Sequence, residues 1–199
     1  MLGKTHAAVG AAMSLYVVRP HSVSGIALTL TAGIIGGLLC DIDSSHTELH
    51  KKAALLGIAS LAIIVTGVAT GRITRNGSLL NSLMQNEAVA LRILCGAGLF
   101  LISFLGSFTH HRSFTHSIVF TVMVYWLMLI AFYPAARAIT AGVTSHIAID
   151  FLNERGEKLF WPINKRFSLK LCSSDGTVNK AMFYMGVGAT ILLIFSAVI

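Results

Sequence analysis

The chain has 199 residues, of which 55% are hydrophobic and only 12% are charged. Its mean hydropathy of +0.77 leaves too few polar groups to coat a soluble globule, since an ordinary soluble domain carries about 25% charged residues. This composition excludes a disordered chain and a nucleic-acid-binding domain, and it indicates an integral membrane protein. The net charge of +7 fits the excess of Lys and Arg that membrane proteins keep on their cytoplasmic side. Cys40, Cys95 and Cys172 are too few and too far apart to predict a disulfide framework or a zinc knuckle.

Hydrophobic runs organise the whole chain, so we expect a single integral membrane domain over residues 1–199. A helix needs about 20 residues to cross a bilayer upright. The runs lie at 5–18, 23–40, 53–70, 88–108, 117–135, 136–152 and 181–199. The first is short and the sixth is the most polar, so that the sixth either crosses fully or is partly submerged. The predicted fold is an all-α, polytopic membrane helix bundle with about 6–7 hydrophobic helices, and its polar segment at 153–180 lies at the membrane interface.

Successive crossings alternate in direction, which assigns the ends of the runs to two sides. The side of the N-terminus holds ten Lys and Arg residues against five on the other side, which predicts that it is cytoplasmic. The same side collects His6, Asp41, Asp43, the segment 109–116 and the end of the sixth run. Ionisable groups at helix ends of membrane proteins are candidates for function. We therefore expect one polar site at the cytoplasmic face.

Two short patterns on that side are suited to metal binding. His146 and Asp150 are spaced i, i+4, which places imidazole and carboxylate on one helix face. They can bind one ion, Asp150 can orient His146, or the two can form a hydrogen bond inside a bundle. Asp41 and Asp43 follow an apolar helix, where two carboxylates can bridge ions or divide the roles of ligand and base. Helix-end solvation is the simpler explanation of that pair.

The segment from His111 to Ser117 carries the most chemistry. It offers two imidazoles, His111 and His116, of the kind that suits zinc and similar ions. Arg112 supplies a guanidinium that can hold phosphate oxygens in a bidentate fork. Thr115 or Ser117 can cap the helix that follows.

These motifs occur together in a known order. They are Thr5-His6, Cys40-Asp41-Ile42-Asp43, His111-Arg112-x-x-Thr115-His116-Ser117, Ser145-His146-x-x-x-Asp150 and Gly156-x-x-Leu159-Phe160-Trp161-Pro162, followed by Arg166-Phe167. On them, residues 3–170 resemble the YdjM-like family of bacterial inner-membrane proteins, LexA-regulated metal-dependent hydrolases. The resemblance implies a multi-pass location in the inner membrane and hydrolysis, by loose analogy of a phosphoester. It also implies a divalent-metal site on His6, Asp41, His111, His116, His146 and Asp150. The chain departs from the family pattern at Cys40, Ser113 and Asn153, none of which is an implied ligand.

The leading hypothesis is a membrane-embedded metal-dependent hydrolase that acts on a lipid-borne phosphoester, with a membrane lipid as its partner. With Asp43 the candidate ligands number seven, which exceeds the roughly four that one zinc ion takes and suits two ions. We expect Asp43 to bridge or to act as base, and Arg112 to stabilise phosphoryl charge. We expect Thr115, Lys165 and Arg166 to bind substrate.

Two other functions stay open. An ion or small-solute transporter would use the intramembrane His and Asp as a path, although a path places polar groups along the depth of the bundle. A non-catalytic membrane protein would use the metal only to hold helix ends together. A metal-independent lipid phosphatase that ends in HxxxD is excluded, because Ile139 and Thr140 stand where its Ser-Arg pair belongs.

Overall fold

A computed structural model describes residues 1–43, 87–107 and 112–198, and this part of the chain is helical. Its backbone forms no strand beyond two isolated β-bridges. The α-helices are α1 (Gly3–Val18), α2 (Val23–Leu39), α5 (Glu87–Ser107), α6 (Ile118–Ala131), α7 (Tyr133–Phe151) and α8 (Thr177–Val198). There are two short 3-10 helices: η1 (Cys40–Asp43) directly follows α2, and η2 (Phe114–His116) directly precedes α6. The all-α prediction is confirmed for the described residues.

The helices follow the hydrophobic runs closely. The run at 53–70 lies outside the described residues, and each of the others has a helix within a few residues of its bounds. The boundary between the runs at 117–135 and 136–152 was wrong, because α6 ends at Ala131 and α7 begins at Tyr133. Pro134 stands in the first turn of α7, where its fixed φ and missing N–H suit a helix start.

Length decides how many described helices can cross a bilayer. Within α8, the 21-residue segment Thr177–Ala197 is long and apolar enough to cross, with a mean hydropathy of 1.6. Only 6% of its apolar window is buried inside the protein. The apolar segments Val23–Leu39, Leu91–Gly106 and Ile118–Ala131 are shorter. At 1.5 Å per residue, α6 is about 21 Å long, against roughly 30 Å of hydrocarbon. A multi-pass arrangement therefore stays a prediction.

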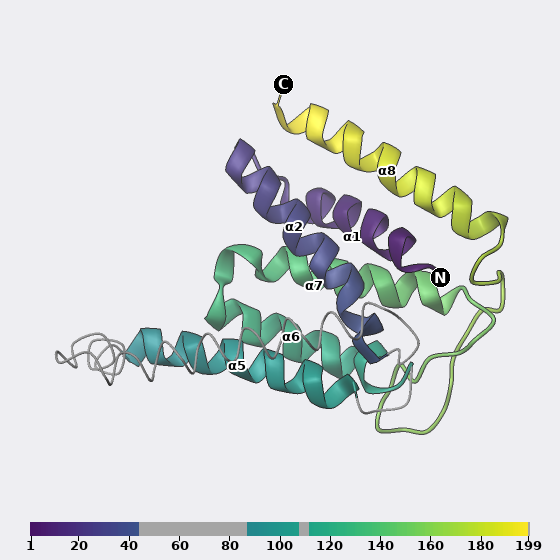
Figure 1. The fold of residues 1–199 in the computed structure, drawn as a ribbon, viewed down its shortest axis with the longest axis horizontal. Coiled ribbons are helices and arrows are strands. Elements are labelled where there is room, and N and C mark those ends of the chain that lie inside the picture. The colour runs from purple at the N-terminus through teal and green to yellow at the C-terminus, as the bar shows by residue number, and fades with distance from the viewer. Residues whose placement is uncertain (44–86, 108–111, 199) are drawn as a thin grey trace, which may run out of the picture.

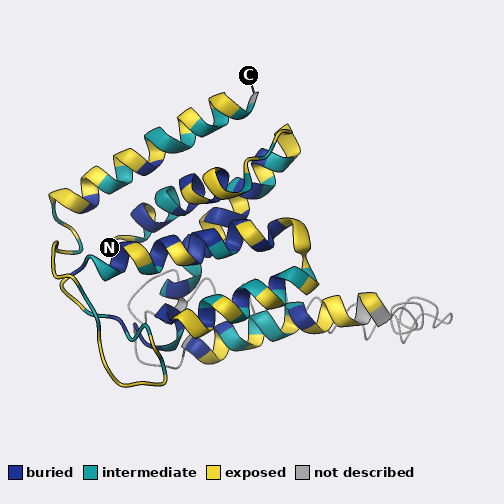
Figure 2. Cartoon of the chain, turned by 180° about the vertical axis from the view of Figure 1, so that it is seen from behind, coloured by how far each residue is buried: buried dark blue, intermediate teal, exposed yellow. Residues whose placement is uncertain are grey.

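Three helices form the centre of the molecule. In Figure 1, α1, α2 and α7 lie side by side, α8 covers α1, and α6 and α5 follow outward from α7; the same pairs are in contact. Figure 2 shows buried residues on the facing sides of α1, α2 and α7, and a largely exposed α8. The core between α6 and α7 includes Phe120, Val124, Ala136, Ala138 and Val143, all fully buried.

Glycines let α2 approach its two neighbours closely. A Cβ on Gly37 would lie 2.5 Å from the His6 carbonyl oxygen of α1. A Cβ on Gly142 of α7 would collide with the Gly33 carbonyl oxygen and lie 2.8 Å from the Gly37 nitrogen. Small residues at such contacts are typical of helix packing in membranes, where they let backbones meet. The contact also sets how near α7 comes to the end of α2.

We expect Gly142→Ala to lower the midpoint of thermal unfolding in detergent. The new methyl meets backbone atoms of α2, which cannot move aside as a side chain can, and such overpacking costs about 1–3 kcal/mol. Gly188→Ala on α8 is the matched control, because no described atom lies within 4 Å of its Cβ position. Equal midpoints for the two variants would contradict this packing.

The connection between α7 and α8 folds back over one end of the bundle. Glu157 and Phe167 exchange two backbone hydrogen bonds of 2.9 Å. The backbone N–H of Ile118, at the start of α6, donates to the Leu159 carbonyl at 3.0 Å. At the start of α8, Asn179 accepts from the Thr5 hydroxyl at 2.9 Å. These contacts place the connection and three helix ends around one small volume.

Candidate metal centre

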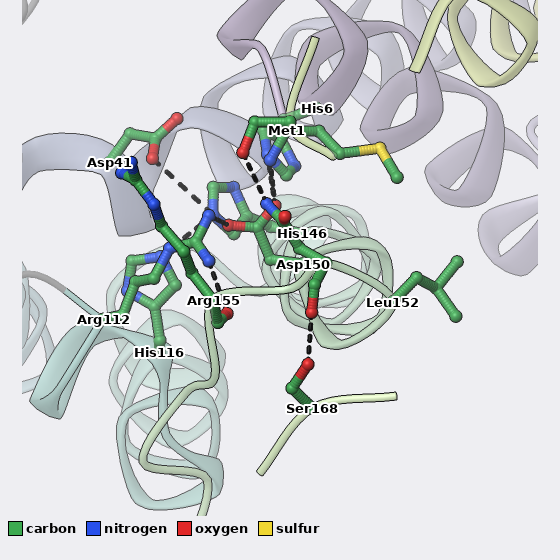
Figure 3. Close-up of polar contacts among 12 residues, drawn as sticks. Met1, His6, Asp41, Arg112, His116, His146, Asp150, Leu152, Arg155 and Ser168 are labelled. Atoms are coloured by element: carbon green, nitrogen blue, oxygen red, sulfur yellow. Dashed lines mark hydrogen bonds and ion pairs between the residues drawn. The ribbon is translucent and has the colours of Figure 1, made fainter. Parts of the chain in front are cut away.

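Side chains from four elements meet at this end of the bundle. His6 comes from the first turns of α1, Asp41 from η1, His116 from η2, and His146 and Asp150 from the last turns of α7. Figure 3 shows them facing one another, with Arg112 alongside. The three histidines are fully buried, and Asp150 is 2% exposed. Sequence positions up to 144 apart are thus brought together, as the alternating topology predicts.

A backbone carbonyl fixes the tautomer of His146. Its Nδ1 lies 2.7 Å from the Gly37 carbonyl oxygen, and since a carbonyl only accepts, Nδ1 carries the proton. In the neutral ring Nε2 therefore presents a lone pair. That lone pair faces His116 Nε2 at 3.2 Å and Asp41 Oδ1 at 3.8 Å. A histidine held through one nitrogen, with the other aimed at a group of ligands, is typical of metal centres.

His116 is held by its neighbour in the chain. The Thr115 hydroxyl, fully buried, lies 3.1 Å from His116 Nδ1. Ser117 follows and caps α6, accepting from the Phe120 N–H at 3.1 Å. The segment Thr115–Ser117 therefore orients one imidazole and starts one helix. If His116 Nε2 carries a proton, it donates a hydrogen bond to His146 Nε2. The contact between these two histidines therefore does not by itself require a cation.

Asp150 lies between positively charged groups. Its Oδ1 is 3.2 Å from His6 Nε2 and accepts a hydrogen bond from the Met1 amino group. Its Oδ2 accepts from Arg112 Nη2 at 2.7 Å. The two carboxylate oxygens thus face different sides of the site, which suits a group that contacts two cations.

Arg112 joins α7 to the connection. Its backbone has a φ of 63°, in the left-handed region that few non-glycine residues adopt. Its Nη1 donates to the Arg155 carbonyl at 2.6 Å, and its own carbonyl accepts from the Lys158 N–H at 3.2 Å. The guanidinium thus contacts Asp150, and the stabilisation of phosphoryl charge expected of Arg112 stays a prediction.

The remaining predicted residues fall in two groups. His111 lies outside the described residues, and so does the side chain of Asp43, whose backbone ends η1. Lys165 and Arg166 are exposed on the connection, where Lys165 lies over the Phe167 ring at 5.3 Å and Arg166 donates to the Gly156 carbonyl. Thr115, predicted to bind substrate, is buried against His116. Their roles in substrate binding and catalysis stay predictions.

Glu157 is a residue that the sequence did not single out. Its side chain is fully buried, and its carboxylate lies with His116 and Asp150 in one group of potential ligands. Burial raises its pKa to about 9, and the nearby charge of Asp150 adds to that shift. Burial likewise raises the pKa of Asp41. A single acidic residue in a polar segment forms no sequence pattern that predicts burial. The burial of Glu157 is therefore seen only in the folded structure.

The donor set fits a divalent cation. Three groups bring ligand atoms within 4.8 Å of one another: His6, His146 and Asp150; Asp41, His116 and His146; and His116, Asp150 and Glu157. Nδ1 of His6 is buried without a hydrogen-bond partner, and its Nε2 faces only the Asp150 carboxylate at 3.2 Å; a buried polar group without a partner costs free energy. Imidazole and carboxylate together are the usual ligands of zinc and similar ions.

Comparisons with known proteins agree with the sequence motifs. The family model described as YdjM inner membrane protein matches residues 1–199, the whole chain. No curated protein and no solved structure matches. The match includes every residue of the candidate metal centre and the apolar helix α8. The chain belongs to the YdjM inner membrane protein family.

Proposed function

We propose that the chain is a membrane-embedded, metal-dependent hydrolase that cleaves a lipid-borne phosphoester at the cytoplasmic face. One observation carries this proposal: ligand side chains from four elements converge at one end of the bundle. They are His6, Asp41, His116, His146 and Asp150. A mixed set of imidazoles and carboxylates is what hydrolytic zinc and related centres use.

The chain's own residues hold the ligands in place. A bound divalent ion would supply a water of lowered pKa and polarise a phosphoryl oxygen. The Gly37 carbonyl directs Nε2 of His146 toward the centre. The Thr115 hydroxyl orients His116, and Arg112 orients Asp150. Ligands fixed in this way need little reorganisation during a reaction.

The surroundings of the centre support an anionic lipid as substrate. The connection over the site carries Arg155, Lys165 and Arg166 as exposed cations, and guanidinium groups bind phosphate oxygens in bidentate fashion. The Arg155 carbonyl contacts Arg112, so this cationic segment lies directly beside the ligands. Zinc is the ion we propose, because the donors are nitrogen and oxygen atoms in a small, buried set.

The positions of the ionisable side chains along the bundle favour an enzyme over a transporter. In α1, α2 and α7, the described ionisable side chains lie toward the helix ends. Ser14, which is buried deeper, is bonded to the carbonyl oxygens of Gly10 and Ala138 at 2.7 Å. A permeation path would instead place ionisable groups along the bundle. The convergence of four elements also favours a second candidate, a structural metal that holds these ends together.

Turnover separates these two candidates. We expect the purified protein in detergent to hydrolyse at least one member of a panel of anionic phospholipids and isoprenoid phosphates. A chelator should abolish that activity and Zn²⁺ should restore it, because the ion supplies the nucleophile. Bound metal without turnover of any panel member, in protein whose thermal unfolding midpoint falls on chelation, would favour the structural metal instead.

A further inference from the structure

Glu157 is directed into the site by a clamped backbone. Its N–H donates to the Phe167 carbonyl and its carbonyl accepts from the Phe167 N–H, both at 2.9 Å. The next residue, Lys158, donates its N–H to the Arg112 carbonyl at 3.2 Å. These three backbone hydrogen bonds fix the direction of the buried Glu157 side chain, whereas Glu154 and Arg155 on the same connection are exposed.

The carboxylate of Glu157 is buried without a partner. Its exposure is 0%, and neither Oε1 nor Oε2 has a hydrogen-bond partner. The ionised form of such a carboxyl group is unfavourable unless a charge or a donor compensates it. The charge of Arg112 favours the ionised form of Glu157, but its Nη1 and Nη2 donate to the Arg155 carbonyl and to Asp150. A divalent cation bound beside Glu157 would compensate this buried carboxylate directly.

The ligand atoms beside Glu157 are of the right kind for a metal. Its carboxylate lies within 4.8 Å of ligand atoms of His116 and Asp150. Asp150 also belongs to the group with His6 and His146, and its two oxygens face different sides. Two-metal centres commonly place their ions about 3.5–4 Å apart, which a carboxylate shared between two neighbouring groups allows.

Charge supports the same conclusion. Asp41, Asp150 and Glu157 bring three carboxyl groups to the centre, against two fixed cations, the Arg112 guanidinium and the Met1 amino group. One divalent ion held by His6, His146 and Asp150 leaves the carboxylate of Glu157 with no direct partner. A second ion beside His116 supplies one.

We propose that Glu157, His116 and Asp150 bind a second divalent cation, with Asp150 shared between the two ions. This inference rests on the metal centre of the proposed function. The seven ligands expected from the sequence suited two ions but did not include Glu157, which adds a ligand from the connection between α7 and α8. The connection thereby becomes part of the metal centre as well as a cover for it.

Manganese titration of the metal-free protein in detergent tests the proposal without any substrate. Unbound Mn²⁺ is counted by electron paramagnetic resonance, which gives the number of ions bound per chain. We expect ~2 ions for the wild-type protein and ~1 for Glu157→Gln, since a two-metal centre loses one site with its ligand. Glu154→Gln is the matched control, because Glu154 is exposed on the same connection three positions away; it should bind as the wild type does.

The outcomes separate this inference from the proposed function. Equal numbers and affinities in the wild-type protein and Glu157→Gln would overturn the second site and leave the first intact. No binding by the wild-type protein would overturn both. Glu157→Met, which keeps the length of the side chain without its oxygens, replaces Glu157→Gln if that variant does not fold. Saturating Mn²⁺ should also raise the unfolding midpoint of the wild-type protein more than that of either variant, because each bound ion stabilises the folded state.

Discussion

Replacing His116 and His146 together with alanine should remove the bound divalent ion from the purified protein. The two Nε2 atoms lie 3.2 Å apart at the centre of the ligand groups, and each of the three groups contains at least one of these histidines. No group then keeps three ligands, which is about the minimum for a catalytic zinc site. The metal content is measured by mass spectrometry after dialysis against a weak chelator.

The control for this double variant is His21→Ala. His21 is exposed in the turn between α1 and α2, at the opposite end of these helices. It should keep the full metal content, and helical circular dichroism should be the same for both variants. Metal content that the double variant retains at the wild-type level would show that the ion binds elsewhere.

Replacing Arg112 with alanine should destabilise the protein strongly. The guanidinium bonds Asp150 and the Arg155 carbonyl in a buried position. Without Arg112, Asp150 keeps the Met1 amino group and His6 at Oδ1, but Oδ2 loses its donor, and leaving a buried charged group short of a partner costs about 1–3 kcal/mol or more. The midpoint of thermal unfolding in detergent should fall accordingly. This result differs from the expectation for an exposed substrate-binding arginine, whose loss would leave stability nearly unchanged.

Arg112→Lys is the milder variant, and it tests positioning of the metal ligand. An ammonium keeps the charge but cannot reach both partners as a fork. Loss of such an orienting group typically lowers metal affinity or activity about 10–100-fold. Arg155→Lys is the control, because only the backbone carbonyl of Arg155 is used. Unchanged zinc affinity in Arg112→Lys would show that Arg112 does not position Asp150.

Topology made much of the site predictable from the sequence. The hydrophobic runs fixed the order of helix ends, and alternating direction then placed His6, Asp41, His116, His146 and Asp150 on one side. That expectation agrees with the structure in the end of the bundle that these residues share, since α1, α2, α6 and α7 each have the relevant end there; how closely the ligand atoms approach comes from the structure alone. His6 shows the value of this argument, because a single histidine in an apolar helix indicates nothing by itself.

Contacts between distant backbone atoms could not be predicted. The Gly37 carbonyl that fixes His146 depends on how closely α2 and α7 pack, and that distance is set by Gly142 and its neighbours. Glu157 is buried only because its backbone pairs with Phe167. Arg112 was expected at the substrate because its chemistry suits phosphate. The structure adds its left-handed backbone and its bond to Asp150, neither of which a sequence pattern records.

X-ray absorption at the zinc K-edge tests the metal centre most directly. In protein loaded with Zn²⁺, we predict nitrogen and oxygen ligands at about 2.0–2.2 Å, with the outer scattering of imidazole from more than one histidine. The His116→Ala/His146→Ala variant should lose this signal. A sulfur ligand at about 2.3 Å, which Cys40 beside Asp41 would supply, or a spectrum without imidazole scattering, would contradict the proposed centre.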